Sequence, residues 1–104
     1  MYLNDVKLLG EVGADAALKN LANDGAIMDF VLITTENFKN YKNIPMTKKE
    51  EHRIVAFNDT AKNAAPEGRL SRGTKILVEG FLRSHEFNGH LIPEVIARRV
   101  QTLS

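Results

Sequence analysis

Basic side chains are the groups in this sequence whose type and spacing favour a chemical role, because they occur in three clusters. The clusters are Lys39, Lys42, Lys48 and Lys49; then Arg69, Arg72, Lys75 and Arg83; and finally Arg98 with Arg99. Lysine and arginine neutralise phosphate groups, so such clusters indicate a polyanionic partner such as nucleic acid. The alternative is that they are solvated charges on loops. The formal net charge is only +1, whereas a binder of duplex DNA usually carries a larger basic excess.

Catalytic and metal-binding chemistry receives little support from the remaining polar residues. The candidate metal ligands are His52, His85, His90, Asp59 and Glu94. They lack the helical i, i+4 spacing and the paired-ligand motifs of metal sites. The glycines form neither a phosphate-binding loop nor a dinucleotide fingerprint. The absence of cysteine excludes disulfides, thiol nucleophiles and thiolate metal sites. The sequence therefore predicts a protein that is not an enzyme and that holds no cofactor or metal.

A glycine inside a strand pattern indicates the kind of fold that must position these residues. The segment Gly73–Arg83 opens on a turn glycine, runs apolar through residues 76–78 and carries Gly80 in its interior. A glycine in mid-strand usually marks a bend, a bulge or a close approach of two backbones. Small closed β-barrels need such corners, because a short strand must leave one sheet and enter another.

Hydrophobic alternation and turn residues predict the other elements. Strands are expected at residues 6–12, 26–35 and 52–57, from residue 75 onward and at residues 90–103. Residues 15–21 either continue the first strand after a bulge or form a short turn of helix. The dipeptides at 24–25 and 88–89 predict hairpin tips, since Asp-Gly and Asn-Gly supply the positive φ angles that tight turns need. A polar loop is expected at residues 36–49. Thr60 is the expected N-cap of a helix over residues 61–65.

These elements predict an all-β fold, a five-stranded OB-fold barrel with one short helix between strands 3 and 4, in a single domain over residues 1–104. Hydrophobic residues make up 43% and charged residues 26%, as in ordinary soluble globular proteins. No apolar run approaches the roughly 20 residues that span a bilayer, and the N-terminus lacks the features of a signal peptide. We therefore expect an intracellular, cytoplasmic protein without a membrane partner.

Four segments, in the same order and spacing, resemble the bacterial-type single-stranded DNA-binding protein family. Val6–Asp15 is similar to the family's opening strand and its Gly-x-Asp turn, and Asp29–Phe38 to its second strand with a Thr/Ser-Glu-x-aromatic exit. Glu50–Phe57 resembles the family's Thr-Glu-Trp-His-Arg-Val-Val-x-Phe strand. Gly73–Arg83 resembles Lys-Gly-x-x-Val-Tyr-Val-Glu-Gly-x-Leu-Arg. The resemblance runs almost from end to end and implies sequence-independent binding of single-stranded DNA in replication, repair or recombination.

The resemblance also implies where bases would stack. Such proteins stack bases on aromatic side chains and follow the backbone with a basic groove. Phe38, Phe57 and Phe87 occupy positions at which the family has Trp or Phe. Phe57 is alternatively a core residue, because it alternates with its neighbours along a strand. Tyr41 is an additional candidate for stacking, among the lysines of the expected loop.

One aromatic platform of the family is missing. The position before His52 and Arg53, usually Trp in the family, is Glu51, and the chain contains no tryptophan. A carboxylate cannot stack on a base and repels phosphate, so we expect an affinity about 1–3 kcal/mol weaker than the family norm. We assign Phe30 and Phe81 to core packing.

The basic groove implied by the resemblance comprises Lys7, Lys39, Lys42, Lys48, Lys49, Arg53, Arg72 and Arg83. Each neutralised phosphate releases counterions, so binding is expected to weaken steeply as salt rises. His52 corresponds to a family position near the subunit interface, where it would have a structural role.

The resemblance implies a partner of the same kind, in a homotetramer or a homodimer built by barrels that pair across their first strands. Exposed strand edges need covering in any case. The sequence ends without the acidic tip by which family members recruit replication and repair proteins, so we expect either a truncated or a naturally short member. The alternative is an adaptor similar to primosomal replication protein B, which mainly binds protein partners.

Overall fold

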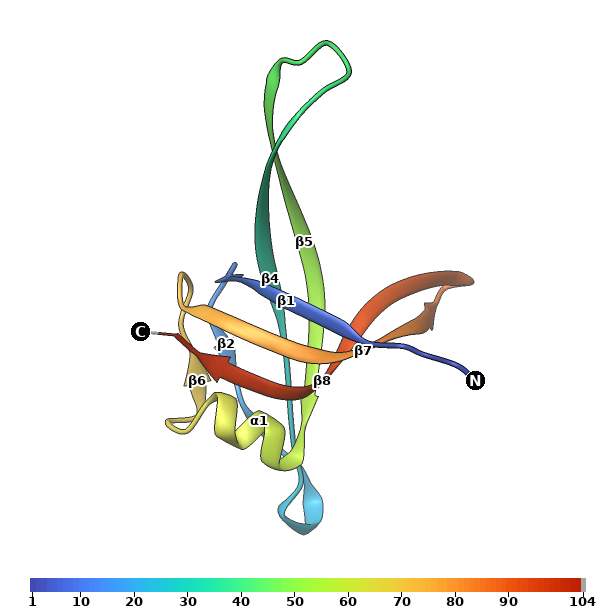
Figure 1. Ribbon diagram of the computed structural model, residues 1–104. Coiled ribbons are helices and arrows are strands. Elements are labelled where there is room, and N and C mark those ends of the chain that lie inside the picture. The colour runs from blue at the N-terminus through green and yellow to red at the C-terminus, as the bar shows by residue number, and fades with distance from the viewer. Residues whose placement is uncertain (104) are drawn as a thin grey trace.

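Strands make up most of the computed structural model, which describes residues 1–103 (Figure 1). The strands are β1 (Val6–Val12), β2 (Ala16–Ala17), β3 (Lys19–Asn20), β4 (Ala26–Lys39), β5 (Pro45–Phe57), β6 (Arg69–Leu70), β7 (Lys75–Phe87) and β8 (His90–Thr102). The helices are a 3-10 turn, η1 (Ala22–Asp24), and a short α-helix, α1 (Asn58–Ala64).

The five long strands form a closed ring. Hydrogen bonding joins them in the order β1–β7–β8–β5–β4, and a short pairing of β1 with β4 closes the circle. All of these pairs are antiparallel except β5 with β8, which run in parallel. The α-helix lies between β5 and β7, the third and fourth of the long strands. The predicted fold class, five strands in a barrel with one helix between strands 3 and 4, is confirmed.

The core is made by the side chains that alternate toward the inside of the ring. Met28, Leu32, Ile54, Ile76 and Val78 are fully buried there. The helix α1 lies across one end of the barrel and adds two buried alanines to the same core. Because strand side chains alternate between two faces, the residues between these core positions point to the outside of the barrel.

Gly80 is the corner that its place in the strand pattern predicts. The β7–β8 register shifts between Glu79 and Gly80, as at a β-bulge. A Cβ atom at this position would collide with the backbone carbonyl oxygen of Ile96. Only glycine lets β8 approach β7 closely enough to keep the ring closed at this corner.

The prediction of a polar loop at residues 36–49 is wrong, because most of this segment belongs to two strands. β4 continues to Lys39 and β5 begins at Pro45, in unbroken register along a hairpin that projects from the barrel (Figure 1). Asn37 and Thr47 join the two strands by a side-chain hydrogen bond of 2.9 Å. Both faces of this hairpin meet solvent, so its strands do not need the apolar alternation by which a half-buried strand is recognised.

The predicted helix cap is also wrong. α1 begins at Asn58 and ends at Ala64, and Phe57 stands at the N-cap without a side-chain hydrogen bond. The hydroxyl of Thr60 instead donates to the backbone carbonyl of Arg98 at 3.4 Å. Asn58 adopts a positive φ of 50° and its side-chain oxygen accepts a hydrogen bond from the Ala26 amide. The helix is therefore held by contacts to β8 and β4.

Both predicted hairpin tips are present, although the first uses different residues for its turn. The positive φ angles at the β3–β4 turn belong to Asn23 and Asp24, while Gly25 has a φ of −73°. Asn88 and Gly89 have the positive φ angles expected at the β7–β8 tip. Neither interpretation of residues 15–21 describes the structure: this segment forms two short separate strands, of which β2 pairs with β6 in a second sheet and β3 pairs with β4.

Candidate nucleic-acid interface

The outer face of the sheet around β5 and β8 carries several of the predicted site residues. On β5, Ile54 and Ala56 belong to the core, so the residues that alternate with them point outward. On β8, Val95 and Ala97 belong to the core in the same way. The parallel register places Val55 beside Ile96 on this outer side of the sheet; both side chains are buried, so they underlie the face and join its two strands without a gap.

A hollow of about 250 Å³ on this face brings together Phe57, Arg53 and Arg83, three of the predicted site residues. They come from β5 and β7 and share the hollow with His85 and Glu94, among others. Phe57 is partly buried at the edge of the hollow and does not belong to the core cluster.

Phe87 lies on the same side of β7 as this hollow. It follows His85 by two residues, and no register shift interrupts the β7–β8 pairing between Arg83 and Phe87. Its side chain is 58% exposed near the tip of the β7–β8 hairpin. Its ring is thus open to stacking, while the hairpin backbone around it is fully paired.

A buried carboxylate organises the two arginines of the hollow. Glu94 is only 4% exposed, and its Oε1 atom accepts a hydrogen bond from Arg83 Nη2 at 3.1 Å. Its other oxygen, Oε2, lies 3.5 Å from Arg53 Nε, and Arg53 Nη2 also lies 3.5 Å from Asp29. Both arginine side chains remain about half exposed. Their free N–H donors are therefore available to a phosphate group, while Glu94 holds the two side chains in place.

The sequence indicated Glu94 only as a candidate metal ligand without the spacing of a metal site. It did not predict that Glu94 pairs with two arginines. The available signal is a lone glutamate within the apolar strand of residues 91–97, since a buried carboxylate needs partners. Arg83 could have been found, because the predicted Asn-Gly tip at residues 88–89 places it opposite Glu94 across the hairpin. Arg53 could not, because it lies on a distant strand that is joined to β8 only by the parallel pairing.

The β4–β5 hairpin carries a second group of predicted residues: Phe38, Tyr41, Lys39, Lys42, Lys48 and Lys49. Phe38 is 41% exposed and Tyr41 is 92% exposed. The Lys42 ammonium lies 5.6 Å from the centre of the Tyr41 ring, a cation–π distance. Lys48 donates a hydrogen bond to Glu50, with the two charged atoms 3.0 Å apart, which raises the pKa of Lys48 above its ordinary value. The charge of Lys48 is therefore partly offset by Glu50 on the same hairpin.

Two predicted residues lie apart from both groups. Lys7 is on β1, opposite Glu79, and the ring order separates β1 from β5 and β8 on both sides. Arg72 lies between β6 and β7, where its backbone N–H donates to the Asp15 carboxylate at 2.7 Å. Whether Lys7 and Arg72 contact DNA stays a prediction.

The assignment of Phe30 and Phe81 to the core is half right. Phe30 is 5% exposed and belongs to the core cluster. Phe81 lies outside that cluster and is only partly buried, because the bulge at Gly80 brings it to the outer face beside Ile96. The guanidinium carbon of Arg98 lies 4.6 Å from the centre of the Phe81 ring.

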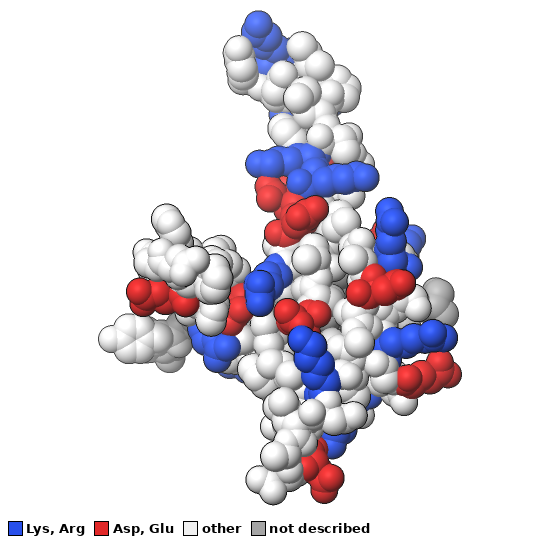
Figure 2. Space-filling model, turned by 180° about the vertical axis from the view of Figure 1, so that it is seen from behind, with Lys and Arg blue, Asp and Glu red and all other residues white. Residues whose placement is uncertain are grey.

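Glu51, the residue at the missing platform, is exposed and shares the outward side of β5 with Arg53. His52 points the other way and forms a 2.8 Å hydrogen bond with the Thr34 hydroxyl. Viewed from behind, basic side chains extend from the hairpin tip down to the barrel, with acidic side chains between them (Figure 2). Acidic and basic side chains are thus interspersed on this face, in agreement with the small net charge.

Among residues 1–103, no three His, Asp or Glu side chains are grouped so that they could hold a metal ion. No helix in this part of the chain is long and apolar enough to cross a membrane.

A closed five-stranded ring with this connectivity and one intervening helix defines the OB-fold class, and the aromatic and arginine side chains on its outer face are typical of its nucleic-acid-binding members. The model of the "Single-strand binding protein family" matches residues 3–103. The chain therefore belongs to the single-strand binding protein family.

Individual relatives agree with this membership. "Single-stranded DNA-binding protein 1" of Chlorobaculum tepidum is 30% identical over 86 residues, which cover 83% of this chain and 52% of that protein. The chain thus spans about half the length of the curated relative it matches.

Solved structures share the fold over nearly the whole chain. The Plasmodium falciparum SSB, in complex with ssDNA, superposes with a TM-score of 0.82 at 26% identity, covering 100% of this chain and 97% of that one. A deletion mutant of the Thermus aquaticus single-stranded DNA binding protein gives a TM-score of 0.83 at 25% identity, covering 98% and 51%. A small single-stranded DNA-binding protein from Streptomyces coelicolor, 19% identical, has the same fold with a TM-score of 0.74, covering 98% and 94%.

Proposed function

We propose that this protein binds single-stranded DNA without sequence preference, by stacking bases on exposed aromatic rings and by neutralising phosphates with arginine and lysine. The observation that carries the proposal is the outer face on which Phe57, Phe87, Arg53 and Arg83 lie together. Family membership and the likeness to an SSB that was solved in complex with ssDNA support it.

The chemistry of this face suits single-stranded DNA, whose bases are unpaired. An aromatic ring stacks on any base, because every base has a π-face, so recognition needs no sequence-specific hydrogen bonds. The two arginines held by Glu94 offer N–H donors to the phosphates between stacked bases. Duplex DNA hides its bases inside the helix, so the same face would discriminate against it.

The proposal is tested by titrating the protein into a fluorescently labelled oligo-dT of roughly 35 nucleotides and following its anisotropy at low and moderate salt. Duplex DNA of the same length is the control. Intrinsic fluorescence is a poor readout because the chain has no tryptophan. We expect salt-sensitive binding to the single strand and much weaker binding to the duplex. Equal binding to the two DNAs would contradict the proposal.

Replacement of Glu51 by tryptophan is expected to increase the affinity for oligo-dT. The change adds a stacking surface and removes a negative charge beside Arg53, on an exposed position of β5. One stacked base contributes roughly 1–3 kcal/mol, so the dissociation constant should fall by about 5-fold or more. Glu51→Gln is the matched control, because it removes the charge without adding a ring. An affinity equal to that of Glu51→Gln would show that position 51 does not face the bound strand.

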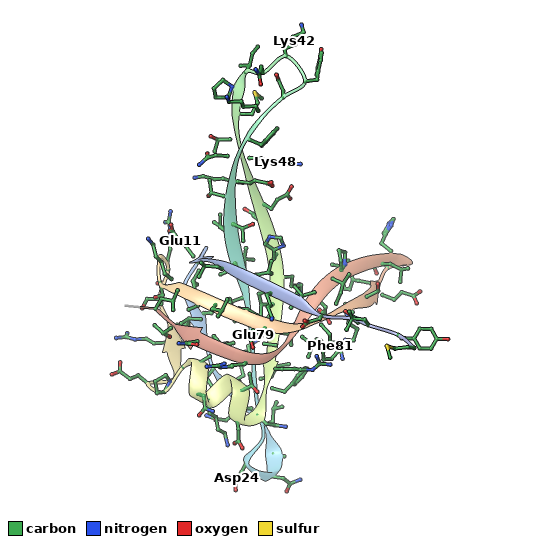
Figure 3. All side chains as sticks on the ribbon, viewed as in Figure 1. Glu11, Asp24, Lys42, Lys48, Glu79 and Phe81 are labelled. Atoms are coloured by element: carbon green, nitrogen blue, oxygen red, sulfur yellow. The ribbon has the colours of Figure 1, made fainter. Side chains whose placement is uncertain are left out.

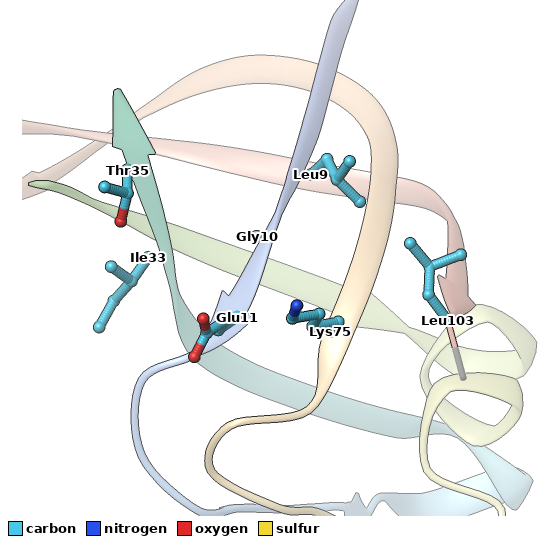
Figure 4. Close-up of a pocket in the computed structure, with 7 residues that line it drawn as sticks. All are labelled: Leu9, Gly10, Glu11, Ile33, Thr35, Lys75 and Leu103. Carbon is cyan, nitrogen blue, oxygen red and sulfur yellow. The ribbon is translucent and has the colours of Figure 1, made fainter. Parts of the chain in front are cut away.

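We also propose that copies of the chain associate through β1. This strand pairs with β7 along residues 6–11 but meets β4 only near its end, at Glu11 and Val12 and in the close approach of Gly10 to Ile33, so its other edge is open over residues 6–9. Leu9 projects outward and is 60% exposed beside a hollow of about 250 Å³ that Ile33 and Leu103 also line (Figure 4). An open edge with an apolar flank suits pairing with a second copy, in a homodimer or a homotetramer.

Leu9→Asp is expected to shift the protein toward the monomer without unfolding it, because the side chain is already largely exposed in the single chain. A carboxylate placed in an apolar contact would be buried without a partner. Sedimentation equilibrium of the wild type and the variant measures the change. Leu21→Asp, at a 51% exposed position outside β1, is the matched control. A wild type that is monomeric at all concentrations would contradict the proposal.

We further propose a single-domain binding protein without catalytic activity, which coats single strands during replication, repair or recombination in the cytoplasm. A second candidate function, an OB-fold adaptor for protein partners, is favoured by the carboxylate at Glu51 on the candidate face. Strand coating would be supported by three or more exposed rings on one face among Phe38, Tyr41, Phe57 and Phe87. Phe38, Tyr41 and Phe87 are exposed and Phe57 is partly buried, but Phe38 and Tyr41 lie on the β4–β5 hairpin, apart from the other two. The oligo-dT titration therefore decides between strand coating and the adaptor function.

A further inference from the structure

Phe81 and Arg98 form a pair on the barrel that the proposed function does not yet use. The guanidinium carbon of Arg98 lies 4.6 Å from the centre of the Phe81 ring, within the range of a cation–π interaction. Phe81 is partly buried and Arg98 is exposed, so the arginine covers the ring and itself faces solvent. Figure 3 shows Phe81 on β7, where the β7–β8 arm leaves the barrel.

The pair is continuous with the candidate interface in two directions. Along β7, Phe81 precedes Arg83 by two residues, so both side chains project from the same side about 7 Å apart. Across the sheet, Phe81 pairs with Ile96, and Ile96 pairs with Val55, which lines the hollow beside Phe57. No loop or helix has to be crossed between the hollow and the pair.

Arg98 differs from the two arginines of the hollow in its ion pairing. Arg53 and Arg83 are both paired with Glu94. Within residues 1–103, none of the ion pairs involves Arg98. A guanidinium that rests on an aromatic ring keeps a flat exposed surface and edge donors, so it can stack on a base and donate to a phosphate.

We propose that Arg98, supported by Phe81, is an additional subsite of the interface, which takes one base by stacking and the adjacent phosphate by hydrogen bonding. The proposal rests on the proposed function, because its ligand is the same single strand. The subsite extends the path of the bound DNA from the hollow along β7 and β8, in the direction away from Phe87 at the hairpin tip. It supplies a planar platform in a chain whose position 51 lacks one.

The test compares Arg98→Lys, Arg98→Ala and Arg99→Ala in the oligo-dT anisotropy titration over a series of salt concentrations. Lysine keeps the charge but has no flat surface, so we expect binding about 3- to 10-fold weaker with an unchanged salt dependence. Alanine should weaken binding further and reduce the slope of log affinity against log salt by about 0.7, the value for one phosphate on a single strand. Arg99, whose side chain bonds to Gln101, is the matched control and should stay within about twofold of the wild type.

The outcomes separate this subsite from the function on which it rests. Equal affinity of all three variants and the wild type, together with weaker binding by Phe87→Ala, would overturn the subsite and leave strand binding intact. Equal losses in Arg98→Ala and Arg99→Ala, with no loss in Arg98→Lys, would also overturn it, since only general charge would then matter. A wild type that does not bind the oligonucleotide would overturn the function and the subsite together. Thermal unfolding of each variant checks that the fold is retained.

Discussion

Replacement of both Phe57 and Phe87 by alanine should weaken binding to single-stranded oligo-dT by about 30-fold or more, because two stacking surfaces of roughly 1–3 kcal/mol each are removed. Both rings lie on the outer face that includes the hollow of Arg53 and Arg83, so a bound strand would contact them together. No charge is removed, so the salt dependence of the remaining binding should be unchanged. Fluorescence anisotropy over a salt series measures both quantities.

Two controls make this result specific to stacking. Leu91→Ala removes an exposed apolar side chain from the same hairpin but from the opposite face to Phe87, and should bind like the wild type. Phe57→Leu keeps apolar volume at a partly buried position but removes the ring. Weaker binding by this variant would therefore be due to lost stacking and not to lost packing. Phe38→Ala tests separately whether the β4–β5 hairpin takes part. Wild-type affinity in the Phe57 and Phe87 double variant would refute stacking on this face.

Replacement of Arg53 and Arg83 by methionine should destabilise the fold by about 2–4 kcal/mol, because it leaves the buried carboxylate of Glu94 without its two arginine partners. Glu94 is 4% exposed and each of its oxygens faces one of these arginines. Methionine retains most of the apolar length of arginine, so the loss of packing is small. The free energy of unfolding in urea, extrapolated to water, measures the effect.

A third substitution identifies the cause. Adding Glu94→Met to the double variant should restore most of the lost stability, since a buried ion-pair network replaced by apolar groups of similar volume is often close to neutral. Arg99→Met, which removes an exposed arginine bonded only to Gln101, should change the free energy of unfolding by less than about 0.5 kcal/mol. A double variant as stable as the wild type would mean that water, and not the arginines, solvates Glu94. All variants without Arg53 and Arg83 should bind DNA weakly.

Elements with one buried face were predictable from the sequence. The strands at β1, β7 and β8 follow alternation in their apolar residues, and the β7–β8 tip follows from Asn-Gly chemistry. The bend at Gly80 was predictable because a glycine in mid-strand usually marks a corner or a bulge. The extended β4–β5 hairpin was not predictable, because strands that are solvated on both faces lack a periodic pattern of apolar residues. The first residue of α1 was not predicted correctly, because tertiary contacts of Asn58 and Thr60, and not a side-chain cap, hold the N-terminal turn of the helix.

The kinds of residue that make up the candidate interface were determined by the sequence alone. Aromatic and basic residues in family-like motifs indicated Phe57, Phe87, Arg53 and Arg83, and a bound single strand as their ligand. Which of these residues meet was decided only by the tertiary structure. The reason is physical: the parallel pairing of β5 with β8 and the bulge at Gly80 set which side chains share a face. The Asn-Gly tip sets Arg83 opposite Glu94, but the non-local register that brings Arg53 to the same carboxylate and separates Lys7 and Arg72 from it is invisible to local sequence patterns.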